Sequence, residues 1–179
     1  MKYIFLGPQG SGKSTQAKLL AEKLGLPYIE MSKLLREKLN DEDEDAYVIK
    51  KAFASGDLVP PKIVVHTLNQ KLQEIKNGYV LDGFPRNLTQ FQGFKDKVDK
   101  IFYVAVSDEE AIKRLMLRKR EDDSPQVIAR RLELYHKETE PLLEDLKKEN
   151  LLSEINGEQS IAQIANEIEK VLDESKKIN

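Results

Sequence analysis

Short apolar runs alternate along the chain with segments in which apolar residues recur every three or four positions. The runs predict buried strands, and the longer periods predict helices with one apolar face. The predicted strands are, in chain order, residues 2–6, 26–29, 79–81, 101–106 and 151–155. Strands that alternate with helices in this way are typical of an α/β domain, with a parallel sheet covered by helices on both faces.

Several helix ends are marked by residues with a known positional preference. Gly25 follows a helix that begins near Lys13, and glycine is the favoured residue just past a helix end. Ser124 and Pro125 form an N-cap and first-turn pair, which predicts one long helix through about Lys148. Two further amphipathic helices are predicted in residues 64–75 and 161–171.

Residues 31–60 break the alternation, because they read as helices without a strand. We therefore expect a single domain whose core comprises residues 1–30 and 61–179. Residues 31–60 are expected to form a helical subdomain inserted between the second and third strands. Five consecutive acidic residues, 41–45, are expected to form a solvated loop that leads into a helix N-terminus.

The composition of the 179-residue chain excludes several classes of site. Without cysteine, the chain has no disulfide scaffold, no thiol nucleophile and no Cys-ligated zinc or iron–sulfur site. The two histidines, His66 and His136, share no motif, so no zinc is expected and both are interpreted as surface or core residues. The net charge of −2 argues against a nucleic-acid partner. The apolar runs are too short to cross a membrane, and the chain opens directly into a strand, so a cytoplasmic protein is expected.

A phosphate-binding loop is the clearest chemical motif. Residues 7–14 (GPQGSGKS) fit the pattern G-x-x-x-x-G-K-[ST] between a predicted strand and a predicted helix. The glycines let backbone N–H groups turn inward around a phosphate, and the helix N-terminus adds positive potential. Lys13 is expected to reach the outer phosphates, and Ser14 or Thr15 to supply a hydroxyl to a magnesium shell. The expected nucleotide contacts in the loop are Gly10, Ser11, Gly12, Lys13, Ser14 and Thr15.

Further motifs follow in one order along the chain. They are Leu35-Arg36, Gly56 to Pro60 (GDLVP), Asp82 to Arg86 (DGFPR) with Gln90, Arg120 to Asp123 (REDD) and Arg130 to Tyr135 (RRLELY). Together with residues 7–16, they make the chain resemble the adenylate kinases of the nucleoside monophosphate kinase family. The resemblance implies a P-loop three-layer fold with a five-stranded parallel sheet, a helical AMP-binding insertion and a lid over ATP. It implies the reversible reaction of MgATP with AMP to give two ADP, with Mg²⁺ as the only cofactor.

The chemistry of such a reaction explains the residue types. An acceptor phosphate is already anionic, so no general base is needed. The site must instead hold two polyanions in line and neutralise the moving charge. The resemblance assigns this work to five catalytic cations, which are Lys13, Arg86, Arg118, Arg120 and Arg131.

The resemblance also implies how each nucleotide is held. On the AMP side, Arg36 and Arg86 clamp the phosphate, Gln90 reads the adenine edge, and the backbone near Leu58 and Val59 lines the pocket. The full set of AMP contacts implied is Met31, Ser32, Arg36, Asp57, Leu58, Val59, Gly83, Arg86, Gln90, Arg120 and Arg131. On the ATP side, Arg114 stacks on the base, Arg118 meets the phosphates, and the backbone of Gln159 borders the base. Asp82 orients magnesium-bound water.

The chain departs from the family pattern at two places. Only Lys119 separates Arg118 from Arg120, so the lid is reduced to residues 118–123 and a separate lid domain is excluded. We expect ATP to be covered less completely, unless another part of the chain or a second subunit covers it. The second departure is Met31, which aligns with a threonine whose hydroxyl bond to AMP it cannot make; Ser32 is the neighbouring substitute. A monomer or a small homo-oligomer is expected.

Two other functions stay open at this point. A UMP or CMP kinase is the nearest alternative, which Gln90 argues against and Met31 leaves open. A non-catalytic nucleotide-sensing module on the same scaffold would be expected to lose Lys13 or a phosphate-clamping arginine, and all of these are present.

Overall fold

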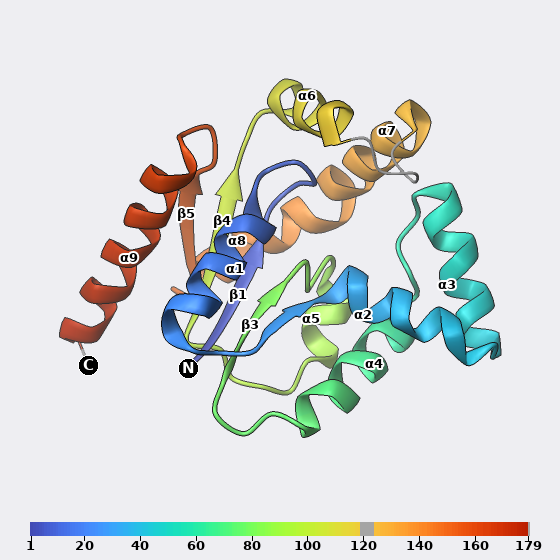
Figure 1. The fold of residues 1–179 in the computed structure, drawn as a ribbon, viewed down its shortest axis with the longest axis horizontal. Coiled ribbons are helices and arrows are strands. Elements are labelled where there is room, and N and C mark those ends of the chain that lie inside the picture. Colours follow the sequence, from blue (N-terminus) through green and yellow to red (C-terminus); the bar gives the residue numbers. More distant parts are fainter. Residues whose placement is uncertain (119–123, 179) are drawn as a thin grey trace.

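The computed structural model describes residues 1–118 and 124–178, with side chains described up to residue 174. Its centre is a five-stranded sheet in which neighbouring strands pair in parallel, in the order β2-β3-β1-β4-β5 (Figure 1). The strands are β1 (Lys2–Leu6), β2 (Tyr28–Glu30), β3 (Tyr79–Asp82), β4 (Lys100–Ala105) and β5 (Leu152–Asn156). The predicted fold class is therefore confirmed. The second strand begins and ends slightly later than predicted.

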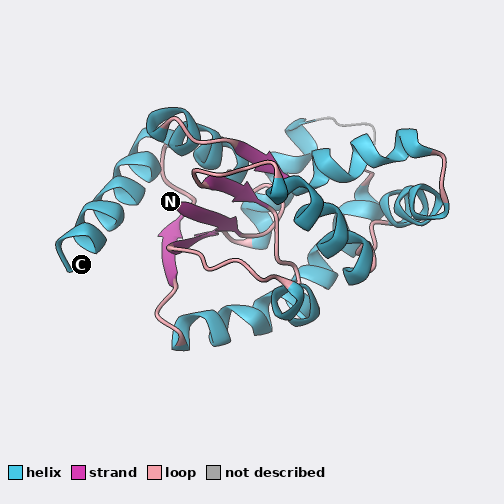
Figure 2. Ribbon diagram, turned by 90° about the horizontal axis from the view of Figure 1, so that it is seen from below, coloured by secondary structure: helices cyan, strands magenta, loops and turns pink. Residues whose placement is uncertain are grey.

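Helices cover both faces of the sheet (Figure 2). Their bounds are α1 (Lys13–Leu24), α2 (Met31–Glu37), α3 (Glu44–Ser55), α4 (Pro61–Gln73), α5 (Leu88–Gly93), α6 (Asp108–Arg118), α7 (Pro125–Leu134), α8 (Glu140–Lys148) and α9 (Ile161–Ile178). Among the described residues, none of these helices has the length and apolar character that a membrane crossing requires.

The alternation of side chains along β1 shows how the sheet separates two cores. Tyr3 and Phe5 pack with α1 and α9 on one face, whereas Ile4 and Leu6 pack with α2, α3, α4 and α8 on the other. Both faces are apolar because successive strand residues point to opposite sides and both sides are covered. A smaller third cluster joins α6 to α7. The two elements that carry Arg114, Arg118 and Arg131 thus pack on each other.

Residues 31–60 form α2, a 3₁₀ turn (Lys38–Asp41) and α3, followed by an extended connection to α4. The acidic run leads into α3, as expected. Asp43 is the N-cap, and its Oδ1 accepts a hydrogen bond of 2.8 Å from the Ala46 amide. Glu44 and Asp45 occupy the first turn, where the helix dipole favours negative charge.

The prediction of one continuous helix from Pro125 to Lys148 is wrong in its middle. A π turn (Tyr135–Thr139) separates α7 from α8. The physical reason is Pro141, which lacks an N–H and whose ring would clash with the carbonyl four residues earlier in a regular helix. The wider turn also aims two buried side chains at the core. Tyr135 donates to the Tyr103 hydroxyl at 2.9 Å, and Thr139 donates to the Arg86 carbonyl at 2.7 Å.

His136 on this π turn makes the stability of the fold depend on pH. Its ring nitrogens lie 3.0 Å from Glu140 and 2.9 Å from Asp108, and hydrogen bonds to these two carboxylates raise the pKa of His136. Because the folded state favours the protonated ring, protonation of His136 stabilises the fold. This stabilisation is complete at pH values below the unfolded-state pKa of about 6.5, and it is lost as pH rises through the folded-state pKa. The side chain is 41% exposed, so the gain is expected to stay below about 1 kcal/mol.

The measurement is urea unfolding of the wild type and of His136→Asn between pH 5 and pH 9. The stability difference should be largest at the acid end and disappear at the alkaline end. His66→Asn, at an exposed position on α4, is the matched control. A difference that grows as pH rises would contradict the assignment.

Candidate active site

The phosphate loop links the C-terminal end of β1 to the N-terminus of α1. Gly10 has φ +86°, and a Cβ there would lie 2.6 Å from the Ala111 carbonyl oxygen, so the loop needs glycine to pack directly on α6. Gly12, at φ +89°, is the N-cap of α1. The first turn of α1 carries no acidic residue, which leaves its positive end available to an anion. Strand ends beside the central strand are also where open parallel sheets bind ligands.

A cleft of about 450 Å³ opens beside this loop. The predicted site residues that line it are Gly10, Gly12, Lys13, Ser14, Thr15, Met31, Ser32, Arg36, Asp57, Leu58, Val59, Asp82, Gly83, Arg86, Gln90, Arg114, Arg118 and Arg131. The fold thus brings together residues that are up to 121 positions apart, from Gly10 to Arg131.

Two of the predicted site residues do not line the cleft, and a third lies outside the described residues. Ser11 is fully buried beneath the loop, where its Oγ accepts a hydrogen bond of 3.4 Å from the Lys13 amide. Gln159 lies outside the residues that line the cleft, and its side-chain amide donates to Glu167 at 2.8 Å. Arg120, with the rest of the predicted lid after Arg118, falls outside the described residues.

Positive charge is concentrated in the cleft. Burial lowers the pKa of Lys13, while Asp82 opposes the shift and Arg86 and Arg118 add to it. Burial also lowers the pKa of Arg86, and repulsion from Arg131 adds to that shift. These cations repel one another and are partly shielded from water. The binding of anions would therefore stabilise the site.

Arg86 is held by the loop that follows β3. Its Nε donates to the Gly83 carbonyl at 3.2 Å, and its amide donates to Oε1 of Gln90 at 2.8 Å. Gln90 is 2% exposed, so it is fixed in the wall of the cleft. The Phe84–Pro85 peptide within the loop is cis. Two predicted AMP residues are therefore positioned by each other.

Met31 does not project freely into the cleft. It lines the cleft but is 2% exposed, and it belongs to the apolar cluster that includes Leu35 and Ile49. The neighbouring Ser32 hydroxyl donates to Glu30 Oε1 at 2.7 Å.

Asp82 meets the cleft as a buried carboxylate. It is 2% exposed, and its Oδ2 accepts a hydrogen bond of 3.0 Å from the Tyr28 hydroxyl. Its Oδ1 is buried and has no hydrogen-bond partner among the described residues. Because such an oxygen is costly to leave unpaired, the donor set fits a hard cation or its bound water. Ser14 and Thr15, which also line the cleft, add hydroxyl oxygens suited to the same ion.

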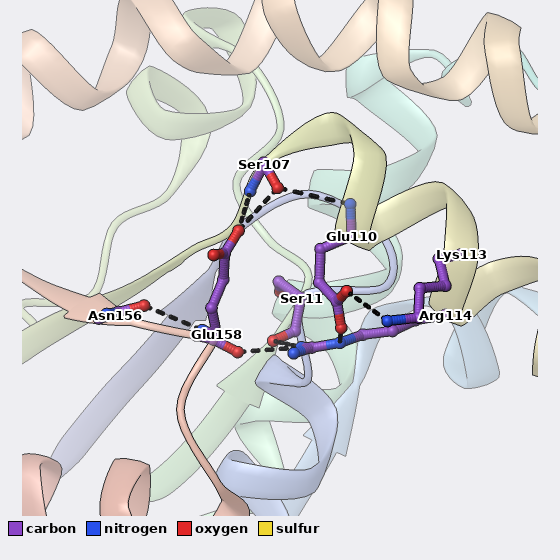
Figure 3. Close-up of polar contacts among 8 residues, drawn as sticks. Ser11, Ser107, Glu110, Lys113, Arg114, Asn156 and Glu158 are labelled. Carbon is purple, nitrogen blue, oxygen red and sulfur yellow. Dashed lines mark hydrogen bonds and ion pairs between the residues drawn. The ribbon is translucent and has the colours of Figure 1, made fainter.

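Arg114 is anchored by three elements at once (Figure 3). Its Nε donates to Glu110 at 2.7 Å, and its Nη1 donates to the carbonyls of Ser11 at 3.3 Å and Gly157 at 3.0 Å. A second set of bonds holds the same elements together. The Glu158 carboxylate accepts from the amide and the hydroxyl of Ser107, at 2.9 and 2.7 Å. The guanidinium of Arg114 is thus fixed between the phosphate loop and the β5–α9 connection.

Three further residues, Glu30, Gln9 and Lys18, line the cleft, and Tyr28 contacts it through Asp82. Of these four, only Gln9 belongs to a motif. The sequence held a signal for Glu30. It directly follows the predicted strand 26–29, and the carboxyl ends of parallel strands meet at one edge of a sheet.

Thr139, on the π turn, supports the backbone of Arg86 and yields a testable prediction. It is 6% exposed and donates to the Arg86 carbonyl at 2.7 Å. Thr139→Val keeps the shape but leaves that carbonyl without its donor, so we expect a loss of about 1–3 kcal/mol of stability. The same stretch of backbone carries the Arg86 guanidinium. The Michaelis constant for AMP, the predicted ligand of Arg86, should therefore rise. Urea unfolding and steady-state kinetics measure the two effects.

Thr139→Ser retains the hydroxyl and should restore the Michaelis constant, although it leaves a small cavity. If Thr139→Val matched the wild type in both measurements, the support of Arg86 by this hydroxyl would be excluded.

Comparison with known proteins agrees with the geometry. The adenylate kinase family model matches residues 5–151. An adenylate kinase of Prochlorococcus marinus (strain NATL1A) is 38% identical, over 96% of this chain and 98% of that protein. Adenylate kinase 1 of a Nostoc species is 34% identical over the same shares of the two chains. An adenylate kinase of Methanothrix thermoacetophila is 33% identical, again over 96% of this chain and 98% of that protein. With the phosphate loop, the arginine-lined cleft and a match over most of its length, the chain belongs to the adenylate kinase family.

Proposed function

We propose that the protein transfers a phosphoryl group reversibly from MgATP to AMP, giving two molecules of ADP. The observation that carries the proposal is the placement of Lys13 and Arg86 in one cleft. Lys13 belongs to the ATP loop at the end of β1, and Arg86 belongs to the loop after the adjacent strand β3. A cation from each nucleotide site therefore faces the space between them.

The reaction needs positioning and charge neutralisation. The γ-phosphoryl group of ATP leaves its β-oxygen and bonds to an oxygen of the AMP phosphate, which carries no proton that must be removed. Negative charge spreads over the transferred group as it moves, and preformed cations stabilise that charge. Lys13 meets the transferred group, and Arg118 and Arg131 approach it from α6 and α7. Arg120 is proposed to act beside them.

AMP is held on the side of the inserted helices, and residues 31–60 serve as its binding subdomain. Arg36 and Arg86 bind its phosphate, because a guanidinium can donate two parallel hydrogen bonds to it. Gln90 reads the adenine edge. Asp57, Leu58 and Val59 close the pocket, with Gly83, Met31 and Ser32 along its walls.

ATP is held by the phosphate loop and α6. The backbone of Gly10 to Gly12 surrounds its phosphates, and Arg114 presents a fixed guanidinium face on which the base stacks. Gln159 is proposed to border the base by its backbone. ATP, AMP and ADP are thus the ligands.

The magnesium ion that accompanies ATP fits the donors near Asp82. Ser14, Thr15 and Asp82 would hold it, largely through water. When bound, it neutralises phosphate charge and orients the phosphates. Cytoplasmic location and a monomeric or small oligomeric state stay predictions.

The inserted helices contact α7 directly and cover one side of the cleft. Arg130 Nε donates to Asp57 Oδ1 at 2.8 Å, which holds the pKa of Asp57 below its usual range. A Cβ on Gly56 would lie 3.1 Å from the Val127 carbonyl oxygen, so this approach requires glycine at φ +77°. We propose that this contact covers part of the cleft, a task for which the short lid has too few residues.

Even so, ATP should be less enclosed than behind a full lid. We expect GTP to compete with ATP as donor, and slow ATP hydrolysis to occur without AMP. Competition assays with both donors and an assay of phosphate release check this. Strong preference for ATP with no hydrolysis would contradict the open ATP site.

A coupled assay of ADP formation tests the acceptor. MgATP is offered with AMP, UMP, CMP or GMP, and without an acceptor. Fast turnover with AMP alone is expected. Preference for a pyrimidine monophosphate would indicate a UMP or CMP kinase instead, and no turnover with any acceptor would favour a nucleotide sensor.

A further inference from the structure

Two carboxylates from neighbouring strands lie side by side at the cleft. Glu30 ends β2 and Asp82 ends β3, and the two residues are partners in the parallel register. Both line the cleft. Residues paired in this way project their side chains to the same face of a sheet.

The two carboxylates share one donor. The Tyr28 hydroxyl lies 3.0 Å from Asp82 Oδ2 and 3.4 Å from Glu30 Oε2. Burial and both negative charges raise the pKa of Tyr28, so the phenol keeps its proton. One proton cannot satisfy two carboxylates. Ser14 of the phosphate loop lines the same cleft.

An unpartnered oxygen within this cluster indicates a missing ligand. Asp82 is 2% exposed, and its buried Oδ1 has no partner among the described residues. Lys13 attracts both carboxylates, but its ammonium donates to the Pro8 carbonyl at 3.2 Å. The pair thus lies beside the phosphate loop, where an anionic nucleotide must bind.

We propose that Glu30 is a second carboxylate of the magnesium site, which with Asp82 accepts hydrogen bonds from water bound to the ion. Magnesium keeps several waters and binds proteins through one or two carboxylates in addition to substrate phosphates. The Ser32 hydroxyl holds Glu30 Oε1 at 2.7 Å and so fixes the orientation of the carboxylate. This inference rests on the proposed use of MgATP. Glu30 lies outside every motif that carried the family assignment.

The consequence is discrimination between metal-bound and metal-free nucleotide. Two carboxylates beside the phosphates repel metal-free ATP and attract the cation of the metal complex. Removing one charge at position 30 should therefore weaken the binding of the metal complex without weakening that of metal-free nucleotide. A residue with a purely structural role would move them together.

The test is calorimetric titration of the full chain with MnATP and, in the presence of a chelator, with metal-free ATP. Manganese is the probe because it takes the same oxygen ligands as magnesium. For Glu30→Gln we expect MnATP to bind about tenfold more weakly, which is typical for loss of an outer-sphere partner. Metal-free ATP should bind as tightly as to the wild type or more tightly. Glu30→Ser carries the same expectation and replaces the Gln variant if that variant does not fold.

Glu37→Gln, an exposed position on α2, is the matched control and should change neither affinity. Equal weakening of both affinities by Glu30→Gln would assign Glu30 a structural role and overturn the proposal, as would no change in either. The readout is binding of ATP without an acceptor. A wild type that discriminates against metal-free ATP but does not turn over AMP would overturn the proposed function and leave this inference standing.

Discussion

Lys13→Met is expected to lower the turnover number by about a thousandfold, the effect of removing a preorganised charge from a transition state. Lys13 lines the cleft, and its ammonium interacts electrostatically with Asp82, Arg86 and Arg118. Its carbonyl partner, Pro8, holds it in place before substrate binds. Steady-state kinetics with MgATP and AMP measures the effect.

The same variant should be no less stable than the wild type. Burial and the neighbouring arginines lower the pKa of Lys13, which means that its charged form is disfavoured in the fold. Methionine fills a similar volume without that charge, so the melting temperature should stay equal or rise. Lys23→Met, whose ammonium forms an exposed ion pair with Glu169, is the control and should retain activity. Activity within tenfold of the wild type in Lys13→Met would contradict the role given to Lys13.

Arg86→Lys is expected to lower kcat/KM for AMP by about a hundredfold, or about 2.7 kcal/mol of transition-state binding. Lysine keeps the charge but cannot bind the Gly83 carbonyl and a phosphate with one planar group. AMP should also lose its ability to raise the melting temperature, whereas ATP should keep it, because ligand stabilisation follows affinity.

Arg114→Lys gives the opposite pattern and serves as the comparison. Its three anchors, Glu110, Ser11 and Gly157, belong to the ATP side of the cleft. Arg114→Lys should reduce the rise in melting temperature that ATP causes and should not change the rise that AMP causes. If both variants weakened the same nucleotide, the assignment of two separate binding sides would be wrong.

The sequence predicted those parts of the fold and site that local pattern determines. The strands are continuous apolar runs because both faces of the sheet are covered, so their positions could be found within a few residues. Lys13 and Arg86 could be identified because each lies in a short motif fixed to a strand end. The family assignment followed from the order of these motifs, and the comparisons confirmed it.

What could not be predicted depends on contacts between distant segments. The π turn after Leu134 had a local signal in Pro141, but its use became visible only through the bonds of Tyr135 to Tyr103 and of Thr139 to Arg86. Glu30 lies outside all motifs, and the role proposed for it depends on its register pairing with Asp82 on the neighbouring strand.

The contact between Asp57 and Arg130 joins positions 73 residues apart, which no spacing rule could reveal. The roles given to the individual site residues stay predictions that the variants above test.

The most direct test of the central claim uses MgADP as the only nucleotide. If the protein transfers phosphoryl groups between two nucleotides, ADP must convert to ATP and AMP in equal amounts, and phosphorus NMR follows all three species in one sample. Equal formation of ATP and AMP, about a thousandfold slower in Lys13→Met, is the predicted result. Unchanged ADP, or AMP that accumulates with inorganic phosphate and without ATP, would contradict the account.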